Sequence, residues 1–388
     1  MVMEQKRELD SVSNLFFVGG LQCVTNSKLG HQHQRNQSLC LTLNRSEFVC
    51  AGYHFGVILH QKNKAAHSFQ SSGSRHSSPV KMGLGSMLGN KEPDEITLWI
   101  ENNLDFGKVT ERSGGASSSW ASSSTITTES GVKLFVKTSS DGPSSMFEGE
   151  AKGLQAMQAT GTLKIPTVYH CGPYSTPFGG NGSFIVMEYL ELGGRMSQRE
   201  LGEKLARMHL AEPLAEEARQ GKFGFPVDNT IGGTFQPNGW MDSWLEFLVE
   251  RRLRHQAKLS RDSQMQDLTE KVCERILNGD FFDGVGDIQP SILHGDLWSG
   301  NVSGCKGQPV IFDPACYYGH HEAEFGMDWC ASFSGDFWEA YNKLIPRKPG
   351  YKERHQIYTA YHYMNHYNLF GGGYYQSAIS ILKSLVSR

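Results

Sequence analysis

Three polar residues in the carboxyl-terminal part of the chain have the types and spacing that phosphoryl transfer requires. Asp296 and Asn301 are five residues apart in His294-Gly-Asp-Leu-Trp-Ser-Gly-Asn301, and Asp313 lies twelve residues further on. A carboxylate at Asp296 can accept the proton of an attacking hydroxyl. The amide oxygen of Asn301 and the carboxylate of Asp313 can hold Mg²⁺ against phosphates. The pattern therefore predicts transfer of a phosphoryl group from ATP to a hydroxyl.

The order of these residues is also that of a kinase catalytic loop. The spacing Asp-x-x-x-x-Asn is the same, with His-Gly-Asp in place of His-Arg-Asp, and Asp313-Pro314-Ala315 stands where protein kinases carry Asp-Phe-Gly. Apolar runs precede and follow the loop, so we expect a loop, a β-hairpin arm and then Asp313 at a strand end. The alternative is a hairpin whose Asp and Asn only cap turns. Turn chemistry does not require these spacings, and we therefore favour catalysis.

The amino-terminal half contains a stretch that could cover phosphates. In Ser113–Trp120, Gly114 and Gly115 would let backbone N–H groups approach a phosphate. A Ser/Gly-rich stretch alone is more often a flexible turn. Here it is followed by Ser124–Thr128, a turn and the predicted strand Val132–Thr138, which contains Lys137. The amino lobe of a kinase has this same order of elements: a loop, a strand, a turn and a second strand that contains a lysine.

Lys137 needs a carboxylate partner if it is to position phosphates. Glu150 lies on the predicted helix Met146–Gln158 and could form that pair. Glu148 is the alternative partner, on another face of the helix. Lys137 could also be a surface lysine on an edge strand.

A predicted buried strand, Ser183–Leu190, would end in the nucleotide hinge. The backbone from Glu188 to Leu190 would bond adenine, and the Met187 side chain would lie behind it. A plain core strand fits the same pattern.

The carboxyl-terminal half has the periodicity of helices. We expect helices at Gln198–His209, Met241–Leu259 and Met265–Leu277, and a long ordered loop at Phe223–Trp240. His209 would be a cap or structural group. The aromatic residues of Tyr361–Asn368 would be core by default, or the wall of a sugar-sized pocket.

Composition excludes several classes of protein. The chain has 388 residues and a net charge of −3, which argues against nucleic-acid or anionic-membrane binding. No apolar run is long enough to cross a bilayer. The eight cysteines form no Cys-x-x-Cys pair, so we expect reduced thiols and no zinc ribbon.

The segment 1–92 differs from the rest of the chain. Between Asp10 and Lys91 it contains one acidic residue, Glu47, and it is rich in Ser, His, Asn and Gln. This composition predicts an organelle transit peptide, with the chloroplast ahead of the mitochondrion. The alternative is a disordered tail without a targeting signal, on a cytoplasmic protein.

Four motifs carry a resemblance to a known family. They are His294–Asn301, Asp313–His320, Met146–Glu150 and Asn365–Gly371. They resemble the fructosamine-kinase family, and its plant members in particular, from about residue 95 to the end. The resemblance implies an α+β, two-lobed protein-kinase-like fold of the aminoglycoside-phosphotransferase type. A small β-rich amino lobe would span 93–190 and a larger helical carboxyl lobe 191–388.

The family's activity then implies a role for each matching residue. The reaction would be ATP-dependent phosphorylation of the sugar 3-hydroxyl of a ketosamine on a protein or small molecule, which leads to deglycation. Asp296 would be the base, Asn301 and Asp313 the Mg²⁺ ligands, and Lys137 with Glu150 the groups that position phosphates. Trp298 and His294 would contact the sugar.

The chain departs from the family pattern at one position. Several members carry a cysteine in the phosphate loop, which can join two chains, where this sequence has Trp120. We therefore expect a monomer without a disulfide through this loop. Two alternatives to a ketosamine kinase are a kinase of another amino-sugar or amino-alcohol and a nucleotide-binding pseudokinase. The second would usually have lost one of the five catalytic residues, and all are present.

Overall fold

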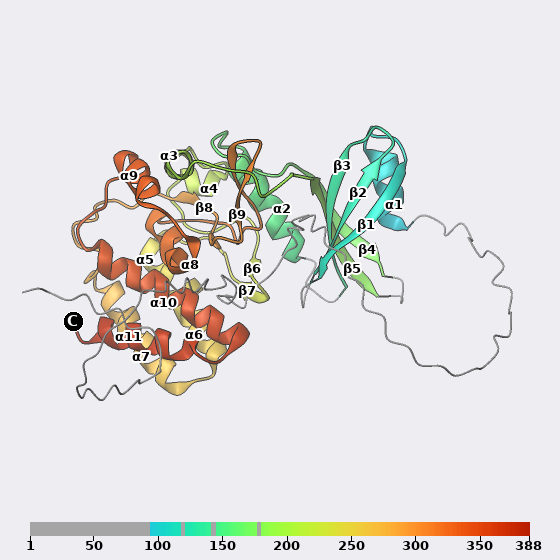
Figure 1. Ribbon diagram of the computed structural model, residues 1–388. Coiled ribbons are helices and arrows are strands. Elements are labelled where there is room, and N and C mark those ends of the chain that lie inside the picture. The colour runs from blue at the N-terminus through green and yellow to red at the C-terminus, as the bar shows by residue number, and fades with distance from the viewer. Residues whose placement is uncertain (1–93, 118–120, 141–144, 177–179) are drawn as a thin grey trace, which may run out of the picture. The chain divides into compact units, whose positions relative to one another are not determined.

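The computed structural model describes residues 94–117, 121–140, 145–176 and 180–388 (Figure 1). These residues belong to one compact unit. The predictions for residues 1–92 and for Trp120 fall outside the described residues.

The amino lobe is a five-stranded antiparallel sheet with a helix on each side (Figure 1). The strand order is β1-β2-β3-β5-β4. The elements are α1 (Glu95–Asn103), β1 (Val109–Ser117), β2 (Ser122–Thr128), β3 (Lys133–Ser139), α2 (Ser145–Gln158), β4 (Val168–Ser175) and β5 (Asn181–Glu188). Strand β1 includes Gly114 and Gly115, so part of the predicted phosphate loop is a strand. Strand β4 is an edge strand of this sheet, and most of its side chains are half-buried.

The central part of β5, Phe184–Met187, is hydrophobic because both faces of the sheet are covered here. Phe184 and Val186 belong to a core with Ile96 and Ile100 of α1. Ile185 and its neighbours on the other face belong to the main core, which α2 shares. Asp94 caps the amino-terminal end of α1, where its Oδ1 accepts a hydrogen bond from the Thr97 N–H at 2.8 Å.

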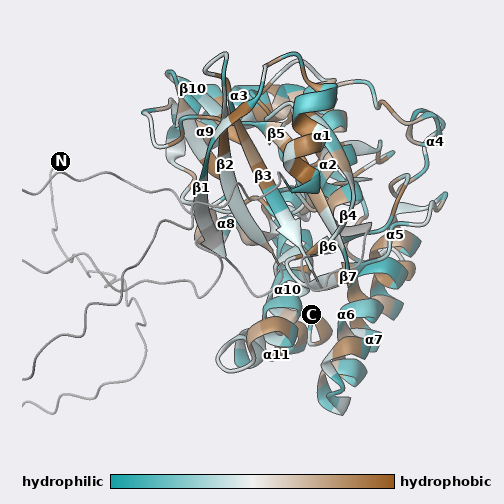
Figure 2. Cartoon of the chain, turned by 90° about the vertical axis from the view of Figure 1, so that its right-hand side faces the viewer, coloured by the Kyte–Doolittle hydropathy of each residue, from teal (hydrophilic) through white to brown (hydrophobic). Residues whose placement is uncertain are grey.

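The carboxyl lobe is mostly helical. Its longer helices are α3 (Gln198–Leu210), α6 (Arg254–Ser260), α7 (Ser263–Leu277), α9 (Gly335–Leu344), α10 (Tyr351–Phe370) and α11 (Tyr374–Val386). Hydrophilic and hydrophobic strips run along α6, α7 and α11, as expected of helices with one buried face (Figure 2). No helix in the described ranges has both the length and the apolar character that crossing a membrane requires.

Shorter elements complete this lobe. They are α4 (Glu216–Arg219), β6 (Asn229–Ile231), β7 (Thr234–Gln236), α5 (Trp244–Phe247), the π-helical η1 (Leu248–Leu253), β8 (Ser291–Leu293), β9 (Val302–Cys305), β10 (Gln308–Ile311), β11 (Tyr317–Gly319), the 3₁₀-helical η2 (His321–Met327) and α8 (Asp328–Ala331). The predicted helix at Met241–Leu259 is α5, η1 and α6 in succession. The predicted long loop contains the β6–β7 hairpin.

Candidate active site

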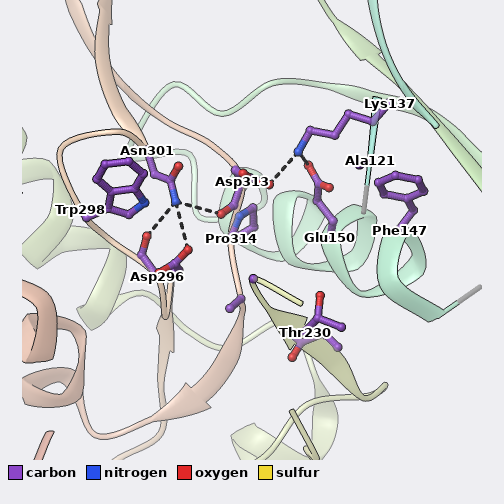
Figure 3. Close-up of a pocket in the computed structure, with 13 residues that line it drawn as sticks. Ala121, Lys137, Phe147, Glu150, Thr230, Asp296, Trp298, Asn301, Asp313 and Pro314 are labelled. Carbon is purple, nitrogen blue, oxygen red and sulfur yellow. Dashed lines mark hydrogen bonds and ion pairs between the residues drawn. The ribbon is translucent and has the colours of Figure 1, made fainter. Parts of the chain in front are cut away.

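The catalytic loop connects β8 to the β9–β10 hairpin, as the sequence predicts, and Asn301 fastens it. The Asn301 Nδ2 donates to the backbone oxygen of Asp296 at 2.9 Å, to the Asp296 Oδ2 at 3.4 Å and to the backbone oxygen of Asp313 at 3.2 Å (Figure 3). The three residues identified by spacing therefore meet at one point. Because one amide group binds all three oxygens, it ties the backbone of Asp296 to that of Asp313.

Gly295 explains why this loop reads His-Gly-Asp. Its φ is 79°, in the left-handed region that favours glycine. A Cβ at this position would lie 2.3 Å from the backbone oxygen of Ala315. The Ala315 N–H donates to the backbone oxygen of His294 at 2.9 Å, so the two segments lie in direct backbone contact. A larger residue would push the Asp313 segment away from the loop.

The Asp296 carboxyl has a raised pKa. Burial, then the negative charges of Asp313 and Glu324, raise its pKa from the usual 3.8 to about 7, against the lowering effect of the Asn301 hydrogen bond. A carboxylate with a pKa near neutrality accepts a proton more readily than an ordinary aspartate.

Asn301 and Asp313 present the oxygens that a hard cation binds. Since Nδ2 makes the three hydrogen bonds, the Oδ1 of Asn301 is left without a partner among the described residues. Asp313 has a left-handed backbone with a φ of 62°, and one of its carboxylate oxygens binds Lys137. An amide oxygen and a carboxylate fit Mg²⁺.

Lys137 lies between two carboxylates. Its Nζ is 2.6 Å from the Glu150 Oε1 and 2.6 Å from the Asp313 Oδ1. Burial alone would lower the lysine pKa, but the two negative charges outweigh it and raise the pKa above its usual value. For Glu150, the effect of burial, which raises the pKa, is larger than the lowering effect of the Lys137 charge, so the pKa of Glu150 is raised. Glu148, the alternative partner, is half exposed and pairs with Lys152 at 3.0 Å.

A cavity of about 540 Å³ extends from this ion pair along the sheet. The predicted nucleotide residues that line it are Gly114, Gly115, Lys137, Glu150, Met187, Glu188 and Leu190. The Glu188 side chain turns to Lys164, with N–O distances of 2.6 and 2.8 Å, so only its backbone remains for a nucleotide. The Leu190 N–H makes no hydrogen bond within the described ranges and can donate to a ligand.

A smaller cavity lies on the other side of Asp313 and is lined by Asp296, Trp298, Asn301, Asn229 and Thr230, among others. A Cβ on Gly300 would lie 2.3 Å from the Trp298 ring, so only a glycine at this position leaves room for the indole. Trp298 stands beside Asp296 (Figure 3).

The other predicted substrate residue, His294, does not face this cavity. Its side chain is fully buried, and its Nε2 is 2.9 Å from the backbone oxygen of Phe312. The Asp296 N–H donates to its Nδ1 at 3.3 Å. His294 therefore supports the loop from behind, and the expected contact with the sugar is corrected to a positioning role.

Glu324 is a functional residue that spacing did not reveal. It is 2% exposed, and its two oxygens accept the backbone N–H groups of His294 at 2.7 Å and Gly295 at 2.9 Å. His209 lies 3.2 Å away and also contacts the Tyr341 hydroxyl at 2.8 Å, which makes His209 structural, as expected. Nothing in the sequence pairs Glu324 with a loop thirty residues earlier, because η2 and β8 meet only in the fold.

One cluster outside the site has potential metal ligands. His320, His321 and Glu322 could place one ligand atom each within 4.8 Å of the others. Both Glu322 oxygens, however, already bind the buried Arg354, at 2.7 and 2.8 Å, and the His320 Nδ1 is 2.8 Å from the Tyr358 hydroxyl. The buried guanidinium would repel a cation, so we assign no metal there.

Comparison with known proteins identifies the family. A model of the fructosamine kinase family matches residues 97–388. The chain belongs to the fructosamine kinase family. The chloroplastic protein-ribulosamine 3-kinase of Arabidopsis thaliana is 45% identical over 298 residues, which cover 74% of this chain and 86% of that protein.

Solved structures confirm the predicted fold. A putative fructosamine-3-kinase from Haemophilus somnus 129PT has a TM-score of 0.64 at 24% identity, over 75% of this chain and 96% of that one. An aminoglycoside phosphotransferase in complex with AMP-PNP and hygromycin B has a TM-score of 0.50 at 14% identity, over 75% and 98%. The fold is the two-lobed, kinase-like α+β fold expected of this family.

Proposed function

We propose that this protein is an ATP-dependent ketosamine 3-kinase, which phosphorylates the sugar 3-hydroxyl of ribulosamine or fructosamine groups on proteins. The phosphorylated adduct decomposes and frees the amine, so the reaction repairs glycated proteins. The observation that carries the proposal is the convergence of Asp296, Asn301, Asp313, Lys137 and Glu150 where two cavities meet. A relative named as a protein-ribulosamine 3-kinase, 45% identical to this chain, supports the substrate class.

We assign the larger cavity to ATP. Its adenine would lie against Met187 and bond the hinge backbone through Leu190, and Lys137, held by Glu150, would bind phosphates. Asn301 and Asp313 would hold Mg²⁺, which supplies charge neutralisation on the phosphates. The structural relative bound to AMP-PNP supports ATP as the donor.

The acceptor would bind in the smaller cavity, with Trp298 against the sugar. Asp296 accepts the proton of the sugar 3-hydroxyl while the oxygen of that hydroxyl forms a bond to the γ-phosphorus of ATP. The bond between this phosphorus and the bridging oxygen breaks, and that oxygen leaves with ADP. The proton then passes from Asp296 to solvent. Positioning and charge neutralisation carry the rate, because the protein makes no covalent bond itself.

Asp296→Asn tests the function. The asparagine keeps the side-chain shape but has a far weaker affinity for a proton, so we expect turnover of a ribulosamine–lysine conjugate to fall at least ~100-fold. ATP affinity, measured by calorimetry on the same preparation, should stay within a few-fold of the wild type. Normal turnover by this variant would remove Asp296 from the role of base. A wild type that binds ATP but phosphorylates no ketosamine would move the proposal to another amino-sugar or amino-alcohol, and then to a pseudokinase.

We also propose that the protein works in the chloroplast. The segment 1–92 has the composition of a transit peptide, and the named plant relatives are chloroplastic. Fluorescence of the full chain fused to a reporter in leaf cells tests this, with the chain lacking residues 1–92 as the control that should stay in the cytoplasm.

A further inference from the structure

The β6–β7 hairpin has one buried face and one open face. Neighbours across the two strands are Asn229 with Gln236, Thr230 with Phe235, and Ile231 with Thr234. Paired residues of antiparallel strands share a face. The first and third pairs are buried, whereas Thr230 is half-buried and Phe235 is 46% exposed. The hairpin therefore presents Thr230 and Phe235 together.

The buried face is tied to the segment that carries Asp313. The Asn229 Nδ2 donates to the backbone oxygen of Cys316 at 2.8 Å, and the Gln236 Nε2 donates to that of Ala315 at 3.1 Å. The Tyr361 hydroxyl donates to the Gln236 Oε1 at 2.6 Å. Because these buried amides have partners on both sides, the hairpin is held at a fixed distance from the reacting groups.

The open face borders the acceptor cavity. Thr230 lines that cavity with Asp296 and Trp298, and Figure 3 shows Thr230 and Trp298 on different sides of the base. The Thr230 hydroxyl has no hydrogen-bond partner in the described part of the chain. A hydroxyl inside a catalytic cavity without a protein partner is available to a sugar hydroxyl.

Phe235 extends the same face outward. Cross-strand partners have Cβ atoms about 4.5–5.5 Å apart, so the Phe235 ring begins next to Thr230, although it does not itself line the cavity. The His255 ring supports it edge-on, with centroids 6.2 Å apart, and the His255 Nε2 is 2.8 Å from the Phe235 backbone oxygen. An exposed aromatic ring held in place beside a cavity is suited to an apolar ligand group.

We propose that the open face of this hairpin selects the acceptor: Thr230 binds a hydroxyl of the ketose, and Phe235 packs against the aliphatic chain of the lysine that carries it. The inference rests on the proposed function, because it names the acceptor of the same site. A ketosamine carries its amine on C1, two carbon–carbon bonds from the reacting C3. In the orientation we propose, the 3-hydroxyl lies at Asp296, another hydroxyl lies at Thr230, and the amine points toward Phe235, the cross-strand neighbour of Thr230.

The carrier contact is tested with two acceptors that have the same sugar. One is the ribulosamine of methylamine, and the other is the ribulosamine of a lysine within a peptide. We expect Phe235→Ala to lower kcat/KM about five- to twentyfold for the lysine peptide through KM, and to change it less than twofold for the methylamine adduct. Phe235→Tyr keeps the aromatic ring and should restore the wild-type kcat/KM for the lysine peptide. Leu277→Ala is the matched control, because Leu277 is 44% exposed on α7.

The sugar contact is tested with Thr230→Val, which removes the hydroxyl and keeps the shape. We expect KM to rise about five- to tenfold for both acceptors, with the KM for ATP unchanged and Thr230→Ser restoring the wild-type value. Equal effects of Phe235→Ala on both acceptors, or none, would overturn the carrier contact, and an unchanged KM in Thr230→Val would overturn the sugar contact. A wild type that phosphorylates neither acceptor would instead refute the proposed function.

Discussion

Glu324 shows how a residue that touches no substrate can set the catalytic loop. Its carboxylate accepts two successive backbone N–H groups, those of His294 and Gly295, immediately before the base. Glu324→Gln replaces one accepting oxygen by an N–H₂ group that faces a backbone donor. Such a buried mismatch costs about 1–3 kcal/mol. We expect the variant to lose that much free energy of unfolding and to lower kcat with little change in the KM for ATP.

The pH dependence of this stabilisation distinguishes the contribution of the ionised Glu324 carboxylate from that of side-chain packing. Burial alone would raise the pKa of Glu324, but the hydrogen bond and charge of His209, with the loop donors, lower it below the usual 4.5. A carboxyl with a lowered pKa in the folded state stabilises the protein fully above 4.5 and loses that contribution as the pH falls through the folded-state value. The difference in unfolding free energy between the wild type and Glu324→Gln should therefore be constant at neutral pH and shrink in acid. A difference that grows in acid would contradict the assignment.

The residues that spacing identified differ in kind from those it missed. Asp296, Asn301 and Asp313 lie in one short, ordered stretch, and the chemistry of phosphate fixes their separation, so the sequence alone predicts them. Lys137 and Glu150 were predictable from the order of loop, strands and helix, which is that of a kinase amino lobe. Glu324 and Thr230 reach the site from segments whose position depends on the whole carboxyl lobe. No local pattern encodes that position.

Helix α2 carries Glu150 and is set against the carboxyl lobe by two glycines. Gly149 and Gly153 are one turn apart. A Cβ on Gly149 would lie 2.4 Å from the Asn229 Cβ, and one on Gly153 would lie 2.8 Å from the Cys316 Cβ. The helix therefore touches both the β6–β7 hairpin and the Asp313 segment closely, and Figure 1 shows α2 beside β6. This contact brings Glu150 and Lys137 to Asp313.

Gly153→Ala tests this contact. The added methyl group must move α2 away from Cys316, which lengthens the distances from Lys137 to Asp313, so we expect kcat to fall about tenfold or more and the KM for ATP to rise. Gly335→Ala at the start of α9 is the matched control, since no atom lies within 4 Å of its added Cβ. Full activity in Gly153→Ala would show that α2 can shift without moving the site.

The sequence predicts α2, α3, α7 and the succession of α5, η1 and α6, but it describes the connections between helices poorly. The periodicity of α2, α3 and α7 was sufficient because each buries one continuous face. The sequence predicts a loop where the β6–β7 hairpin lies, because three-residue strands are too short to show alternation. Its stability comes from the amide network that ties Asn229 and Gln236 to the Asp313 segment, and these are contacts between distant parts of the sequence.

The two lobes share one hydrophobic core, which has a consequence for how the molecule unfolds. The main core combines Leu154 of α2 and Ile185 of β5 with carboxyl-lobe residues such as Phe247 and Tyr358. A core that spans both lobes predicts a single cooperative transition for the residues from α2 to α11. Leu154→Ala removes a fully buried side chain and should cost about 2–5 kcal/mol. If the lobes unfold together, this loss in the amino half must also lower the protection of carboxyl-lobe amides.

Hydrogen exchange with mass spectrometry measures that coupling directly. In a denaturant titration, the amides of β3 and β5 and those of α7 and α10 should lose protection at the same midpoint, and Leu154→Ala should shift both sets equally. Ile100→Ala is the informative comparison, because Ile100 is just as buried but belongs to the separate core between α1 and the outer face of the sheet. The destabilisation by Ile100→Ala should reach the carboxyl lobe only through the sheet. A larger change of the midpoint for β3 and β5 than for α7 would show that the outer core unfolds separately from the main core. Two midpoints in the wild type would mean that the lobes fold independently and that the close contact of α2 is made after each has formed.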